Sequence, residues 1–289
     1  MQRFLQAITN AAACAVLFAL VLATTATGAL AQSKPKQIRI EYVAPKNPAH
    51  RAIYEQMKQA EVLEFVQQAL SSIRLPRSLL FSFTDCDGVV NAWYDGEGVT
   101  VCYEYINEIL KNIPSKKMPL GITKLDVVAG PLLDVFMHEA AHAIFDVLEV
   151  PIFGREEDAA DQFSAYVMLQ FDKERARRLI LGTAYQYTTD IKFSSDAQQP
   201  QVLALKKFSD EHGIPAQRFY NVLCVAYGAD PKLFADVVEQ DYLPKDRAEG
   251  CEDEYDQVSF AFNKLIQPHL GEHLSKRLSK MRSKLKEPQ

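Results

Sequence analysis

Two histidines four residues apart, His138 and His142, are the feature that most constrains this chain. They lie in residues 131–150, where apolar side chains repeat with helical spacing. Residues four apart share one face of a helix, so both imidazoles can converge on one cation. Glu139 follows the first histidine, close enough to reach a water bound to that cation. This spacing is the zinc-hydrolase pattern, with ligands at its ends and a general base inside.

The pattern needs a third ligand, because a five-residue match also arises by chance on an ordinary helix surface. Catalytic zinc usually takes three protein ligands and leaves one position for water. Pro151 and Gly154 end the first helix and allow the chain to reverse. Residues 155–170 predict a second helix, whose acidic first turn suits the positive end of the helix dipole. Its start would lie near the two histidines.

Glu157 is the predicted third ligand, and Asp161 lies one turn further on the same face. Asp161 could accept the ring N–H of a ligating histidine and so fix its tautomer and orientation. Glu156 is the main rival for the ligand role. The alternative is that residues 156–158 are only a favourable acidic first turn.

Together these residues predict metal-assisted amide hydrolysis. Zn²⁺ held by His138, His142 and Glu157 would lower the pKa of a bound water to roughly 7. Glu139 would take the proton of that water and pass it to the leaving amine. The oxyanion that forms needs a further hydrogen-bond donor. The candidates from the C-terminal part are His212, Tyr220 and Tyr227. Arg218 could bind a substrate carboxylate.

This constellation resembles the gluzincin metallopeptidases, whose pattern is HExxH followed by a glutamate, often within ExxAD. Here that second pattern runs from Glu157 to Asp161. The chain also resembles DUF4344, a family of bacterial metallopeptidases named as a domain of unknown function. The segments that carry this resemblance are 86–88, 91–94, 101–104, 138–142, 155–161, 210–212, 218–224, 251 and 254–255. The resemblance implies a zincin fold and zinc-dependent hydrolysis of peptide bonds, without naming a substrate.

The first 31 residues predict a secretory signal peptide. Arg3 precedes an apolar run at 11–23, and Ala29 and Ala31 form a small-x-small cleavage site. The apolar run is short for a membrane span, although an uncleaved anchor is the alternative. No later stretch is long and apolar enough to cross a bilayer. The protein is therefore predicted to be exported, either periplasmic or secreted, with no stable membrane span after cleavage.

The charge of the chain limits the classes of partner that it is expected to bind. The chain has 32 Lys and Arg against 37 Asp and Glu, a net charge of −5. It has no basic stripe, and the short basic segment at 276–286 is predicted to be a solvated helix face. Nucleic acid is therefore not an expected partner, whereas a peptide or protein substrate is.

Four cysteines remain after residue 31, at 86, 102, 224 and 251. An even number in an exported protein predicts two disulfides. Of the three possible pairings, the local one, Cys86–Cys102 with Cys224–Cys251, is favoured. Free buried thiols are the alternative, and a cysteine zinc site is disfavoured because no close CxxC spacing occurs.

The predicted fold class is α+β and zincin-like, with a small mixed sheet, the active-site helix and a mostly helical C-terminal part. Strands are predicted at 38–43, 79–83, 91–94 and 99–103, one helix at 47–72, and a polar loop at 187–201. The predicted parts are a signal peptide at 1–31, a catalytic part at 32–172 and a helical part at 173–289.

The strand at 91–94 is the candidate edge strand that would bind an extended peptide by main-chain hydrogen bonds. An ordinary disulfide-linked hairpin is the alternative there. Two other functions stay open: an exported binding or scaffold module whose zincin-like site has lost turnover, or a hydrolase of cell-wall peptides. Glu139 argues against the binding module, because metal binding alone does not need it.

Overall fold

A computed structural model describes residues 37–114, 118–195 and 208–271. These residues belong to one compact unit. The predicted signal peptide and the basic segment at 276–286 lie outside the described residues, as does the predicted loop beyond residue 195.

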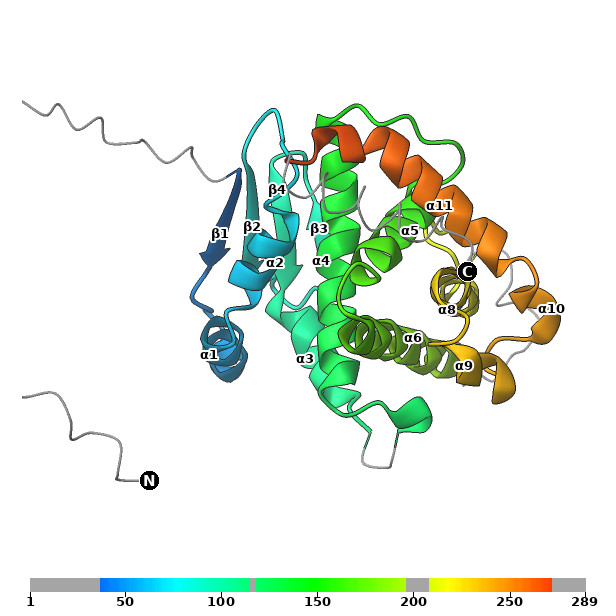
Figure 1. The fold of residues 1–289 in the computed structure, drawn as a ribbon. Helices are drawn as coiled ribbons and strands as arrows, with labels where there is room; N and C mark the ends of the chain where they lie inside the picture. The colour runs from blue at the N-terminus through cyan, green and yellow to red at the C-terminus, as the bar shows by residue number, and fades with distance from the viewer. Residues whose placement is uncertain (1–36, 115–117, 196–207, 272–289) are drawn as a thin grey trace, which may run out of the picture. The chain divides into compact units, whose positions relative to one another are not determined.

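A four-stranded mixed sheet forms the N-terminal part of this unit (Figure 1). The strands are β1 (Ile38–Tyr42), β2 (Leu79–Thr84), β3 (Ala92–Tyr94) and β4 (Gly98–Cys102), in the spatial order β1-β2-β4-β3. β1, β2 and β4 run parallel, and β3 pairs antiparallel with β4 at the edge. β2 and β4 are the two interior strands, and Phe81 and Phe83 of β2 are fully buried, since aromatic residues suit a pleated, covered surface. The predicted α+β class is confirmed.

Two short helices, not one, connect β1 to β2. They are α1 (Arg51–Gln59) and α2 (Val62–Leu70), preceded by the 3-10 turn η1 (Pro48–His50). The single helix predicted over 47–72 is wrong at its centre because Glu61 adopts a left-handed φ of 52°, which interrupts the helix. After β4, α3 (Tyr103–Lys111) begins at once, and η2 (Pro119–Gly121) precedes the next helix.

The histidines and acidic residues lie on the long helix α4 (Asp126–Val147) and on α5 (Glu156–Met168). α4 begins earlier than the predicted residue 131 because Thr123 and Asp126 cap it. The Thr123 N–H donates to the Asp126 carboxylate at 2.7 Å, and the Asp126 N–H donates to the Thr123 hydroxyl at 3.3 Å. This reciprocal pair satisfies donors that a helix start leaves unpaired. α4 is largely buried between the sheet and helices of the C-terminal part (Figure 1).

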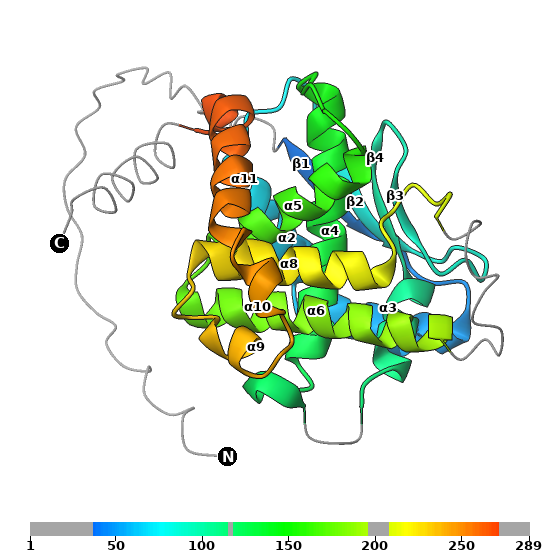
Figure 2. The ribbon, with the colours of Figure 1, turned by 90° about the vertical axis from the view of Figure 1, so that its right-hand side faces the viewer.

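The C-terminal part is helical, as predicted, and packs on α4 and α5 (Figure 2). Its helices are α6 (Lys173–Ser195), α8 (Pro215–Ala229), α9 (Ala235–Glu239), α10 (Lys245–Ala248) and α11 (Cys251–Leu265), with η3 (Gln267–His269) after them. The loop predicted from residue 187 is wrong as far as 195, because α6 continues. Thr188 and Thr189 fit the helix because their hydroxyls donate to carbonyls three residues earlier.

Glycines bring α4 and α6 into close contact. A Cβ on Gly130 would lie 2.5 Å from the Leu179 carbonyl oxygen, and one on Gly182 would lie 2.0 Å from the Asp126 carbonyl oxygen. Only a residue without a side chain permits such a backbone approach. Near this crossing, Thr183 of α6 lines the same cavity as His138 and Glu139 of α4.

Disulfides join Cys86 to Cys102 and Cys224 to Cys251, the local pairing favoured from the sequence. The first ties the loop after β2 to the end of β4, and the second ties α8 to the start of α11. Among the described helices, none combines the length and apolar character required to cross a membrane.

Candidate metal centre

The two motif histidines converge on one point from successive turns of α4. The Nε2 atoms of His138 and His142 lie 3.2 Å apart. Glu157, at the start of α5, adds a carboxylate oxygen 2.9 Å from the first Nε2 and 3.4 Å from the second. Zinc bonds of about 2.0–2.2 Å in a tetrahedral site place neighbouring ligand atoms roughly 3.3–3.6 Å apart. The three atoms therefore have the spacing of ligands around one ion.

The outer nitrogens of both histidines face carboxylates. The Nδ1 of His138 lies 2.8 Å from an Asp161 oxygen, and the Nδ1 of His142 lies 2.7 Å from a Glu156 oxygen. Ionised carboxylates only accept hydrogen bonds, so each Nδ1 is the protonated nitrogen. In the neutral form of each ring, the inward Nε2 then carries a lone pair that faces the Glu157 oxygen. Three electron-pair donors this close need a cation or extra protons between them, and a divalent metal fits this donor set.

Glu156, the rival ligand, therefore occupies a different position from Glu157. It contacts the outer nitrogen of His142 and is about half exposed. An Asp161 oxygen lies 2.8 Å from the Nδ1 of His138, at hydrogen-bonding distance from that ring nitrogen. Hydrogen bonds of this kind fix the tautomer and orientation of a ligating histidine.

Arg218 of α8 forms a bidentate ion pair with Asp161. Its Nε and Nη2 donate to the two oxygens of Asp161 at 2.7 and 2.6 Å. The guanidinium also lies over the Tyr187 ring, 4.7 Å from its centroid. Such a two-point contact is strong and directional. Arg218 thus binds a carboxylate of the protein itself, whereas the sequence suggests that it binds a substrate carboxylate.

Charges shift the pKa values of the whole cluster. Burial lowers the pKa of His138, but the hydrogen bonds that its ring donates to Asp161 and Glu157 outweigh this effect and raise that pKa to about 10. Burial raises the pKa of Glu157, but contacts with three histidines hold it far below its ordinary value. Burial also raises the pKa of Asp161, but its interactions with His138 and Arg218 outweigh this effect and lower that pKa to about 2. Without metal, a proton therefore takes the place of the cation between the histidine and its carboxylates.

Glu139 lies beside this centre in a cavity of about 230 Å³. The glutamate is 8 % exposed, and its burial raises the pKa of its carboxyl. The cavity is lined by parts of α3, β3, α4, α6, α8 and the segment before α8. Its lining residues include Ala92, Tyr105, Asp134, Tyr187 and His212. A carboxyl with a raised pKa next to a metal centre is suited to exchanging protons near neutral pH.

Of the three proposed oxyanion donors, only His212 reaches the cavity. Its Nε2 lies 2.9 Å from the Glu157 oxygen, and its Nδ1 lies 3.2 Å from an Asp210 oxygen. Its ring is nearly parallel to that of His138, with centroids 5.6 Å apart. Tyr220 and Tyr227 lie further along α8 and are not among the cavity-lining residues.

Asp134 and Tyr187 are cavity residues that sequence reasoning missed. The buried Asp134 carboxyl accepts hydroxyl hydrogens from Ser164 at 2.6 Å and Tyr187 at 3.1 Å. Burial also raises the pKa of this carboxyl. Asp134 lies one turn before His138 on the same face of α4, a spacing that could have identified it. Tyr187 had no such signal, because it belongs to a segment predicted as a loop.

A second group of potential ligands lies at the loop that follows β2 and consists of His50, Asp85 and Glu104. Its carboxylates already have hydrogen-bond partners in the protein. Asp85 accepts from the backbone N–H of Asn47 and faces the His50 ring at 2.6 Å. This group therefore has the character of a structural anchor.

Comparison with known proteins points to one family. The sequence model of DUF4344, described as "Putative metallopeptidase", matches residues 42–266. No curated protein and no solved structure matches the chain. The matched region includes all the residues of the metal centre and its cavity.

Proposed function

Because this chain belongs to the DUF4344 family of metallopeptidases, we propose that it is a zinc-dependent peptidase that uses Glu139 as its general base. One observation carries the proposal. Three inward lone-pair atoms, from His138, His142 and Glu157, lie within 4.8 Å of one another beside a buried glutamate. A His₂Glu set with room for water is typical of catalytic zinc.

The donor set favours zinc over magnesium and calcium. Imidazole nitrogens with a single carboxylate suit zinc, whereas magnesium and calcium prefer oxygen ligands. When bound, such an ion polarises a carbonyl group and lowers the pKa of a coordinated water to roughly 7.

Glu139 and His212 supply the remaining chemistry. Glu139 accepts the proton of the attacking water and delivers it to the leaving amine, a transfer that its raised pKa favours. His212 donates a hydrogen bond from Nε2 to the carbonyl oxygen as negative charge develops there, and it does so as an imidazolium, because its hydrogen bond with Glu157 raises its pKa. Asp210 supports this role, because it accepts the His212 backbone N–H at 2.9 Å and also faces its Nδ1.

The edge strand β3 would hold the substrate backbone. The Cys102 N–H bonds to the Asn91 carbonyl and the Asp95 N–H to the Gly98 carbonyl, so every second residue of the strand bonds to β4. In an antiparallel pair the intervening residues direct their N–H and C=O groups outward. Ala92 is such a residue and lines the cavity. An extended peptide can therefore add to this edge beside Glu139.

Export to the periplasm or medium is part of the proposal. The two disulfides support it, because such bonds persist in oxidising compartments. The N-terminal 31 residues would be the signal that directs it. We also propose a catalytic part at 32–172 and a helical part at 173–289, of which α8 contributes Arg218 to the centre.

The test measures bound zinc and the turnover of a broad peptide library by the wild type and by Glu139→Gln. We expect one zinc per chain in both, with kcat lower by roughly 10²–10⁴ in the variant. Zinc without turnover in either protein would favour the binding module. Turnover of peptidoglycan fragments alone would favour the cell-wall hydrolase. Full activity of Glu139→Gln would refute its role as the base.

A further inference from the structure

The loop between β2 and β3 leads directly into the cavity. Its turn is tight, because Asp87 and Gly88 both have positive φ, 52° and 91°. Val90 follows, 52 % exposed, and lines the cavity together with Asn91 and Ala92. The position of this segment therefore sets where the edge strand meets a substrate.

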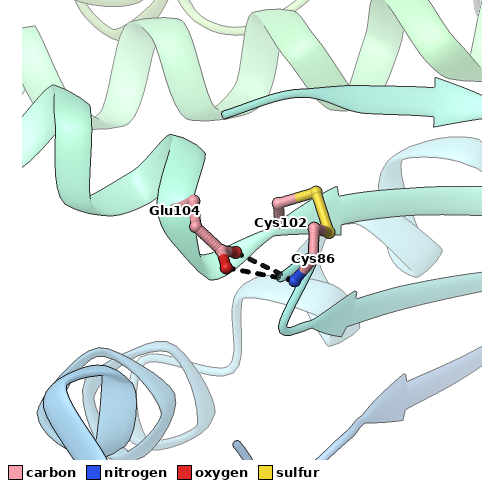
Figure 3. A group of neighbouring side chains, drawn as sticks. All are labelled: Cys86, Cys102 and Glu104. Carbon is pink, nitrogen blue, oxygen red and sulfur yellow. Dashed lines mark hydrogen bonds between the residues drawn. A yellow bond between two sulfur atoms is a disulfide. The ribbon is translucent and has the colours of Figure 1, made fainter. Parts of the chain in front are cut away.

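A buried carboxylate anchors this loop (Figure 3). Glu104, in the first turn of α3, accepts the backbone N–H of Cys86 at 3.0 Å and that of Gly88 at 3.0 Å. The side chain is 8 % exposed. Burial raises the pKa of this carboxyl, but the N–H donors outweigh it and hold the pKa below its ordinary value. The anion is therefore matched to the loop backbone.

A covalent bond anchors the same loop from the neighbouring strand. Cys86 is joined to Cys102, the last residue of β4 and two positions before Glu104 (Figure 3). The Cys102 N–H also donates to the Asn91 carbonyl at 3.2 Å. Both ends of the segment from Cys86 to Asn91 are thus fixed to the junction between β4 and α3.

We propose that Glu104 and the Cys86–Cys102 disulfide are positioning groups that hold the segment 89–92 in register to receive the substrate backbone. This inference rests on the proposed peptidase function. Neither group lines the cavity or contacts the metal ligands, so they act only through the loop. Their loss would weaken the binding of an extended peptide and leave metal binding intact, because the ligands lie on α4 and α5.

The other disulfide provides a matched control. Cys224–Cys251 closes a sequence separation of 27 residues, against 16 for Cys86–Cys102, so their removal has similar entropic consequences for folding. Neither Cys224 nor Cys251 lines the cavity. A general loss of stability would affect both double variants, whereas a loss of positioning would affect only one.

The experiment compares C86A/C102A with C224A/C251A in zinc content, kcat and KM. We expect one zinc in each, a KM about tenfold higher or more in the first variant, and a KM within about twofold of wild type in the second. Glu104→Gln should raise KM by a smaller factor, since one amide oxygen can still accept. Glu55→Gln, which changes an exposed side chain of α1, should not change KM. Equal KM values in the two double variants would overturn the inference.

Two further measurements separate this inference from the proposed function. The Kd of a peptide hydroxamate should rise about tenfold in C86A/C102A, whereas that of acetohydroxamate, which engages only the metal, should not change. If wild type binds neither probe, the peptidase proposal fails. Hydrogen exchange then decides the positioning role: Glu104→Gln must speed exchange in peptides covering 86–92, and unchanged exchange there refutes it.

Discussion

The two halves of the candidate site come from very different stretches of the chain. The metal half consists of His138, His142, Glu157 and Asp161, all on α4 and α5. The cavity half consists of Ala92, Tyr105, Tyr187 and His212, from four separate segments. Neighbouring helices with a short connection bring the first set together, whereas only tertiary packing assembles the second. A metal centre can therefore persist while the surface that selects a substrate varies, and variants should separate the two properties.

The largest effect is expected where the halves meet, at Arg218. Its replacement by Ala leaves the Asp161 carboxylate in a largely buried position without its guanidinium partner. Removal of one partner from a buried pair costs about 3–5 kcal/mol of unfolding free energy. Urea denaturation at pH 7 measures this loss, and metal affinity should fall roughly 10–100-fold.

The control for this change is Arg178→Ala, which removes an arginine from an exposed ion pair on α6. Its unfolding free energy should stay within about 0.5 kcal/mol of wild type. If Arg218→Ala lowers the unfolding free energy as little as this control does and binds metal normally, the ion pair between Arg218 and Asp161 is not needed for stability or metal binding.

His212→Ala should impair catalysis in the cavity half and leave metal binding in the metal half unchanged. We expect kcat to fall roughly 10²–10³-fold, the usual cost of one oxyanion donor, with zinc content unchanged. Tyr220→Phe, on α8 and outside the cavity, should leave kcat unaltered. Steady-state kinetics with metal analysis distinguishes the outcomes. Loss of zinc from His212→Ala would show that this residue belongs to the metal half.

Gly182→Ala should disturb the cavity through the helix crossing. The added Cβ meets the Asp126 carbonyl oxygen at 2.0 Å, so α6 must shift, at a cost of about 1–3 kcal/mol in unfolding free energy. Gly250→Ala adds a Cβ with no neighbour within 4 Å and should cost less than about 1 kcal/mol. Thermal denaturation compares them. Equal stabilities would mean that the crossing tolerates a side chain.

The smallest expected effect is a gradual pH dependence confined to the metal half. The pKa of His138 is about 10 without metal, so below that pH the ion must displace a proton from this side chain. Metal affinity should rise about tenfold per pH unit between pH 7 and 9, as competition with a chelator would measure. A flat profile would contradict proton displacement at His138.

The same contrast explains what the sequence could predict. The positions of His138, His142 and Glu157 follow from helical spacing and one short turn, both local properties. The break at Glu61 and the continuation of α6 through Thr188 and Thr189 depend on backbone conformation and packing that composition does not encode. Arg218 was singled out for its charge, but its partner Asp161 lies far away in sequence, so the pairing could not be foreseen.

The most direct test of this account is the number of zinc ions per chain in wild type, Glu157→Ala and Glu156→Ala. The geometry places a Glu157 oxygen among the inward nitrogens and Glu156 on the outer nitrogen of His142. We predict one zinc in wild type and in Glu156→Ala, and none retained by Glu157→Ala after dialysis. Full zinc in Glu157→Ala, or none in wild type, would contradict the three-ligand centre.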